Sequence, residues 1–163
     1  MISPSELSMF ITASYAKADS GLMTPPQRYI VPKRYTLTFA TLAPAATQTQ
    51  QLQIGANADF FLTRMTYMAT NAGAAQTYSS AIIPQWRIQI TDSGSDEQFY
   101  NAPADINSIA GPGWVGADVM AEPYPRLVTG RSTLTLQASS YEAANTYSVD
   151  LILHGVLVKT YDA

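Results

Sequence analysis

The sequence predicts an all-β protein, an antiparallel β-sandwich of jelly-roll type that carries an N-terminal arm. Several segments alternate between polar and apolar residues, which is the period of a half-buried strand. Glycine, proline and asparagine gather between them, and closely spaced strands separated by turn residues are typical of sandwiches and jelly rolls. The chain has 163 residues, of which 47% are hydrophobic, and this is enough for one domain with a core.

The first residues predict a short helix. Ser3 can cap it, Pro4 suits the first helical position, and Glu6 can complete a capping box. Apolar residues then follow at helical spacing until Asp19-Ser20-Gly21 ends the helix. The apolar face of this helix consists of Leu7, Phe10, Ile11 and Tyr15.

The segment LMTPPQRYIVPKRY comes next, with three prolines and no periodicity. It predicts an extended strap, because proline cannot enter a central strand. Two arrangements of the arm, residues 1–34, are open: the helix packs on its own domain, or the arm lies on another subunit. We favour the second, since chain termini are usually disordered unless something holds them. The arm would then contact its partner through the helix face and through Arg28, Tyr29 and Arg34.

The body is expected to span residues 35–163. In its longest early strand, Phe61, Met65 and Tyr67 are expected on one side. Residues 101–126 are expected to form a long irregular connection. The expected strands cover residues 35–42, 48–54, 60–69, 85–92, 132–138 and 147–158. Strict alternation in four of them predicts a core that contains Leu37, Phe39, Trp86, Ile88, Ile90, Leu134, Leu136, Val149, Leu151 and Leu153.

Composition argues against several classes of function. Charged residues make up only 13% of the chain, about half the usual share, and the net charge is −3. An acidic balance disfavours unaided binding to nucleic acid, which needs a basic face. There is no cysteine, so neither disulfides nor thiolate metal sites can form. No apolar run is long enough to cross a membrane, and Glu6 stands where a secretory signal would carry positive charge.

The only histidine, His154, follows Asp150 by four residues in the segment YSVDLILHGVLV. The alternation places both on the polar side of a strand, where they would be roughly 13 Å apart, too far for a catalytic hydrogen bond. No nucleophile elbow is present, and a single histidine makes no histidine-based metal centre. We therefore expect no enzyme activity, no catalytic residues, no bound metal and no cofactor.

Two further segments have alternative interpretations. DSGSDE (92–97) could be a calcium loop, but it lacks the spacing of one, and an Asx-turn closed by Asp92 explains it better. Trp114 lies in the loop sequence GPGWVG, where it could contact a partner or pack beneath the loop. Trp114 could also line a sugar-binding groove with Trp86, Tyr100 and Tyr124, as aromatic residues do in many β-sandwich lectins, although the alternation of Trp86 with Ile88 favours a core position for Trp86.

Residues 60–158 resemble the capsid decoration (cement) proteins of tailed bacteriophages. The resemblance rests on short motifs: Asp92-Ser93-Gly94, Asn101-Ala102-Pro103, Pro123-Tyr124-Pro125, Thr133 to Leu136, Ala143-Ala144-Asn145 and Leu153-His154-Gly155. It implies a jelly-roll body, oligomers on the outer face of the capsid, and no catalytic residues.

The resemblance implies that the chain is a structural virion protein, made in the host cytoplasm, that binds the outer surface of the phage head and stabilises joints between major capsid subunits. The expected partners are the major capsid protein and further copies of the chain, with a homodimer favoured over a homotrimer, and neither nucleic acid nor membrane. The low charge fits this role, because interface cores are depleted of charged residues. The alternative is a receptor- or glycan-binding jelly-roll module of a phage tail or fibre.

Overall fold

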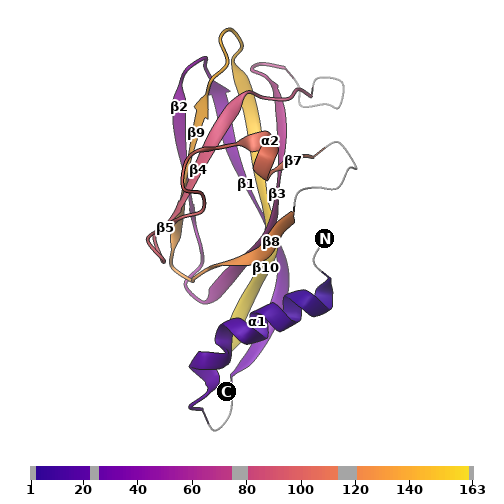
Figure 1. Ribbon diagram of the computed structural model, residues 1–163, viewed down its shortest axis with the longest axis vertical. Coiled ribbons are helices and arrows are strands. Elements are labelled where there is room, and N and C mark those ends of the chain that lie inside the picture. The colour runs from indigo at the N-terminus through magenta and orange to yellow at the C-terminus, as the bar shows by residue number, and fades with distance from the viewer. Residues whose placement is uncertain (1–2, 23–25, 75–80, 114–120, 162–163) are drawn as a thin grey trace.

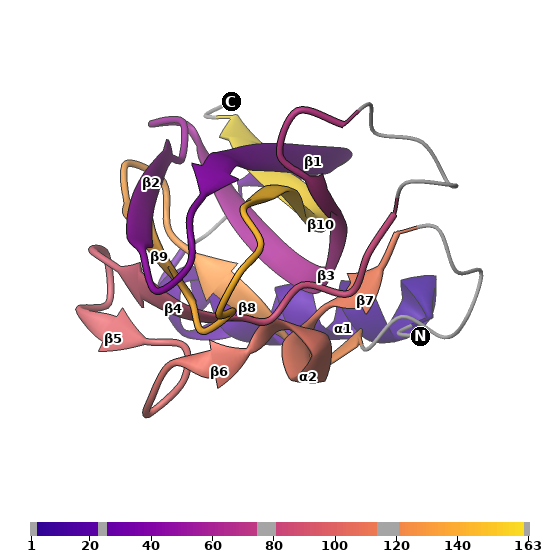
Figure 2. The same cartoon turned by 90° about the horizontal axis from the view of Figure 1, so that it is seen from above.

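The computed structural model describes residues 3–22, 26–74, 81–113 and 121–161. These form two five-stranded sheets, with helix α1 (Pro4–Asp19) lying across one end (Figure 1). Viewed from above, the two sheets enclose the core between them (Figure 2). The predicted all-β sandwich is confirmed.

Long strands build the first sheet. β1 (Gln27–Leu42) pairs with β10 (Tyr147–Tyr161), which pairs with β3 (Ala58–Asn71). On the far side of β3 lie β8 (Ala121–Val128) and β7 (Gly111–Pro112). Among the described strands, β1 pairs with β10 alone, so β1 is an edge strand.

The second sheet is shorter. β2 (Thr47–Gln53) pairs with β9 (Thr133–Ser140), which pairs with β4 (Trp86–Asp92). The short strands β5 (Glu97–Gln98) and β6 (Ala104–Asp105) both pair with β4, and helix α2 (Ile106–Ile109) links β6 to β7. The described residues of the expected irregular connection at 101–126 therefore contain β6, α2, β7 and the start of β8, so this connection is more regular than expected.

All ten side chains predicted for the core are buried between the sheets. Trp86 has no exposed surface and packs edge-on against Phe39, with 5.4 Å between the ring centroids. The side of the first sheet that contacts this core is its inner face, and the opposite side of the same sheet is its outer face.

One predicted orientation is wrong. Met65 and Tyr67 face the core, but Phe61 lies on the outer face, and Phe60 takes the inner position instead. The cause is a β-bulge: Arg64 is opposite His154, Leu62 is opposite Gly155, and Thr63 is the extra residue. An inserted residue reverses the faces of all residues beyond it, and alternation in the sequence cannot reveal it.

Helix α1 begins as predicted. Ser3 accepts a hydrogen bond from the backbone of Glu6, and the Glu6 carboxylate accepts one from the backbone of Ser3 at 2.8 Å. The apolar face of the helix, however, packs on the outer face of the first sheet of the same chain. Of the two arrangements considered for the arm, the structure has the helix on its own body.

The predicted proline strap is the first half of β1. Residues 27 to 34 pair in continuous register with residues 161 to 154 of β10, so the expected domain boundary after residue 34 falls inside a strand. Pro32 is tolerated there because β1 is an edge strand, where a missing N–H can face away from the sheet.

Candidate functional site

The four helix residues predicted to bind a partner belong to a small second core within the chain. Ile11 is buried with Phe61 and Val158, and Leu7, Phe10 and Tyr15 pack around them. The Phe61 ring meets the rings of Phe10 and Tyr15 edge-on, with centroids 6.3 and 6.2 Å apart. Ile11 is thus buried within the chain, and Leu7, Phe10 and Tyr15 are partly buried there.

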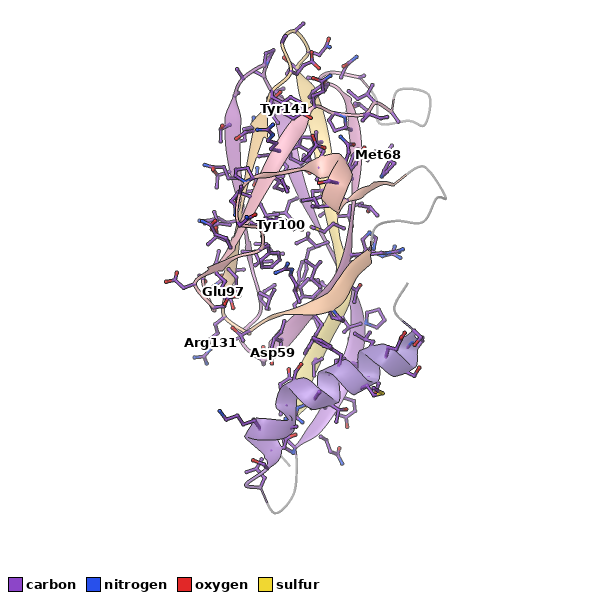
Figure 3. The ribbon with its side chains drawn as sticks, viewed as in Figure 1. Asp59, Met68, Glu97, Tyr100, Arg131 and Tyr141 are labelled. Carbon is purple, nitrogen blue, oxygen red and sulfur yellow. The ribbon has the colours of Figure 1, made fainter. Side chains whose placement is uncertain are left out.

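Arg28, a further predicted contact residue, also has its partners within the chain. Its guanidinium forms a two-pronged ion pair with the Asp19 carboxylate at 2.6 and 2.7 Å and lies over the Tyr15 ring. The Tyr15 hydroxyl donates to Asp59, which lies at the same end of the sandwich as α1 (Figure 3). Burial, followed by the bond to Asp59, raises the pKa of the Tyr15 hydroxyl. The Arg28–Asp19 ion pair thus joins β1 to the end of α1, and the Tyr15–Asp59 hydrogen bond joins α1 to β3.

Tyr29 lies on an exposed apolar segment of the edge strand. The side chains of Tyr29, Ile30 and Val31 are 52%, 46% and 42% exposed. β1 and β10 have 16 and 15 residues, whereas the principal strands of the second sheet have seven or eight, so the first sheet projects beyond the second (Figure 1). The inner face of the projecting part has no second sheet opposite it. We call Tyr29, Ile30 and Val31 the projecting edge.

The other half of the β1 edge is capped by side chains. Gln50 of β2 donates from Nε2 to the Thr38 carbonyl oxygen at 3.0 Å, and Gln48 donates to the Ala40 carbonyl oxygen at 2.9 Å. Even-numbered residues of β1 therefore turn their backbone groups toward the edge, since backbone direction alternates along a strand. By the same alternation, Ile30 and Arg34 present their N–H and C=O groups at the projecting end, where no described strand pairs with them.

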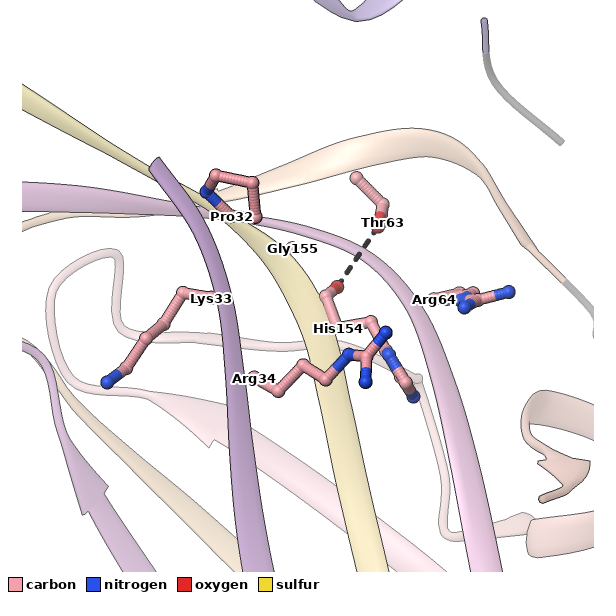
Figure 4. A pocket seen from close by; sticks show the side chains of 7 residues that line it. All are labelled: Pro32, Lys33, Arg34, Thr63, Arg64, His154 and Gly155. Atoms are coloured by element: carbon pink, nitrogen blue, oxygen red, sulfur yellow. Dashed lines mark hydrogen bonds between the residues drawn. The ribbon is translucent and has the colours of Figure 1, made fainter. Parts of the chain in front are cut away.

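Arg34 borders a basic depression of about 480 Å³ on the outer face (Figure 4). The depression lies above the β-bulge, where β1, β10 and β3 run side by side. Arg34 and Arg64 flank His154, whereas Lys33 extends to the other side of β1 (Figure 4). Its lining residues are Pro32, Lys33, Arg34, Thr63, Arg64, His154 and Gly155.

His154 is half-buried and does not form a catalytic pair with Asp150. Its Nε2 lies 2.8 Å from the Thr66 hydroxyl, and Asp150 accepts a hydrogen bond from Thr38 instead. Burial, and then the charges of Arg64 and Arg34, lower the pKa of His154 to about 4. The imidazole is therefore neutral at neutral pH, and these contacts give it a structural environment.

The segment DSGSDE forms the expected turn. The Asp92 carboxylate accepts from the backbone N–H of Gly94 at 2.9 Å and from the Ser95 hydroxyl at 3.0 Å. Within the described ranges, no three His, Asp or Glu side chains come close enough together to hold a metal ion. Trp114, also predicted as a contact residue, lies outside the described residues.

Sequence reasoning did not find Arg64 as a site residue. The bulge at Thr63 brings it onto the same face as Arg34 and His154, and alternation gives no sign of the bulge. The one available signal was the glycine after His154, because a glycine inside a strand often marks a bulge.

None of the helices in the described part of the chain is long and apolar enough to cross a membrane. In comparisons with known proteins, no protein-family model, no curated protein and no solved structure matches the chain.

Proposed function

We propose that the chain is a structural protein that binds the outer surface of a tailed-bacteriophage head and stabilises joints between major capsid subunits. The observation that carries the proposal is the projecting edge, which combines exposed apolar side chains with backbone groups that no described strand pairs. Most proteins protect such an edge, and an unprotected one is a template for pairing with another chain. Pro32 removes one N–H between Ile30 and Arg34, but both of these residues still present their backbone groups at the edge.

The strand order supports the finer fold assignment to a jelly roll. Consecutive strands β1 to β4 alternate between the two sheets, and β9 and β10 then insert between earlier strands in each. This is the arrangement produced by wrapping an antiparallel hairpin into two Greek keys, as in capsid and lectin jelly rolls. The motifs shared with decoration proteins lie in this body.

The proposed mechanism is thermodynamic. A protein that binds two joined capsid subunits, but not separated ones, stabilises the joined state by mass action. Attachment through the projecting edge leaves α1 on its own sheet, so no refolding of the arm is needed. The edge also serves for the proposed self-association if the shell holds adjacent copies close together.

Sedimentation with expanded heads of the phage that encodes the chain tests the proposal. The chain should co-sediment with the heads, and the double variant Tyr29→Ser with Val31→Ser should not. Ile83→Ser is the matched control, because Ile83 is an exposed apolar residue (69%) elsewhere on the surface. A chain that stays in the supernatant, or one that instead binds glycans as an isolated domain, would contradict the capsid role.

A further inference from the structure

Three residues form one cross-strand row on the outer face of the first sheet. Arg34 of β1 is directly opposite His154 of β10, and His154 is directly opposite Arg64 of β3. Neighbouring strands are about 4.8 Å apart, so the two arginine backbones are roughly 10 Å apart with the imidazole between them. The Arg34 guanidinium lies beside the His154 ring, whereas the Arg64 side chain extends away from it (Figure 4), so a rotamer change of Arg64 would bring both guanidinium groups to a single small group above the histidine.

The positive charge of this row is not neutralised within the described ranges. The ion pair found there joins Arg28 to Asp19, at the other side of the bulge. The nearest carboxylate along the described part of β10 is that of Asp150, which is four residues from His154 on the same face and accepts from Thr38 at 2.6 Å. A chain with a net charge of −3 thus keeps Arg34 and Arg64 together around one depression.

The histidine is held so that it can contribute a donor. Thr66, only 6% exposed, lies 2.8 Å from Nε2. When the Thr66 hydroxyl donates to Nε2, the proton of the neutral ring is on Nδ1, which can then donate to a bound group. The Thr63 hydroxyl of the bulge donates to the His154 carbonyl oxygen at 3.0 Å, which holds the backbone of His154 in place.

We propose that this depression is an oxyanion site, in which Arg34 and Arg64 clamp a carboxylate or phosphate group over His154. Guanidinium forks match the two oxygens of a carboxylate or phosphate, and such charge-assisted bonds are about twice as strong as neutral ones. The ligand is either a free phosphate or an acidic side chain of a binding partner, and both present the same chemistry. The site goes beyond the proposed capsid role and does not depend on it.

Because His154 is the only histidine, its ring protons give an unambiguous NMR probe. The full chain is titrated at constant ionic strength with inorganic phosphate in one arm and with glutarate in the other. Saturable movement of the His154 resonances in either arm, together with a higher His154 pKa at saturation, supports the site. The phosphate arm then identifies a free-anion site, and the glutarate arm identifies a carboxylate site.

Variants separate the site from general electrostatic attraction. Arg64→Gln should weaken binding about tenfold or more, and Arg64→Lys should restore only part of it, because lysine lacks the fork. Arg87→Gln is the control: Arg87 lies on the second sheet, where it stacks on Tyr141. Non-saturating shifts in both arms, or equal affinities of Arg64→Gln and Arg87→Gln, would overturn the proposal. Capsid sedimentation of Arg64→Gln, measured separately, shows whether shell attachment uses the same site.

Discussion

Gly155 is the residue on which the β-bulge depends. A methyl group added at Gly155 would lie 2.1 Å from the Phe61 carbonyl oxygen and 2.7 and 2.8 Å from two carbons of the Phe60 ring. The backbone oxygen cannot rotate away as a side chain could, so β3 and β10 would have to separate locally. Overpacking of this kind typically costs about 1–3 kcal/mol, and the contact with backbone places Gly155→Ala at the upper end of that range.

Urea denaturation followed by circular dichroism measures this cost, and Gly55→Ala is the matched control. Nothing lies within 4 Å of a methyl group added at Gly55, so that variant should keep or slightly raise the free energy of unfolding. For Gly155→Ala we expect a loss of about 2–3 kcal/mol, or a melting temperature lower by about 4–10 °C. If the two variants have equal stability, β10 does not approach β3 closely at Gly155, and the bulge does not require a glycine there.

Three further predictions concern the core, the helix and the histidine. Trp86→Ala should lower the free energy of unfolding by about 3–5 kcal/mol in urea denaturation, and a loss below about 1 kcal/mol would mean that Trp86 is not buried. Ile11→Ala should lower the free energy of unfolding by about 2 kcal/mol or more and speed amide hydrogen exchange in α1. Met9→Ala is the control, because Met9 is 73% exposed, and it should change neither the stability nor the exchange. Equal exchange in the two variants would mean that α1 does not pack on the sheet. His154→Gln should keep the fold and reduce the loss of stability on acidification from pH 6.5 to 4. In the natural chain, His154 of the unfolded state takes up a proton between pH 6.5 and 4, whereas His154 of the folded state, with a pKa of about 4, stays largely neutral, so acidification favours the unfolded state. Identical profiles of stability against pH for the variant and the natural chain would refute this.

Alternation in the sequence was sufficient to predict the inner face of the sandwich. Side chains such as Ile88 and Leu151 lie in strands that alternate without interruption, so the period of two assigns them correctly. The capping box of α1 was equally local, because Ser3 and Glu6 meet within one helical turn. Predictions of this kind depend on residues that are neighbours in the chain.

The position of α1 could not be predicted in the same way. The apolar face of the helix was evident, but its binding surface includes Phe61, which alternation had placed on the same side of its strand as Met65 and Tyr67. The preference for another subunit rested on the usual disorder of free chain termini, and not on the pattern of apolar residues in the body. The unrecognised bulge residue, Thr63, is therefore the reason why Phe61 was predicted on the wrong face.

The same bulge connects the two features of the outer face that matter for function. Below Thr63, odd-numbered residues of β3 point outward and supply Asp59 and Phe61 to α1. Above it, even-numbered residues point outward and supply Arg64 and Thr66 to the row around His154. Without the inserted residue, either Arg64 and Thr66 or Asp59 and Phe61 would face the core. The core would then contain either an arginine or the residues that α1 packs against. Since an unpaired buried charge and a lost apolar contact are both costly, the bulge allows one face of one sheet to hold a helix at one end and positive charge at the other.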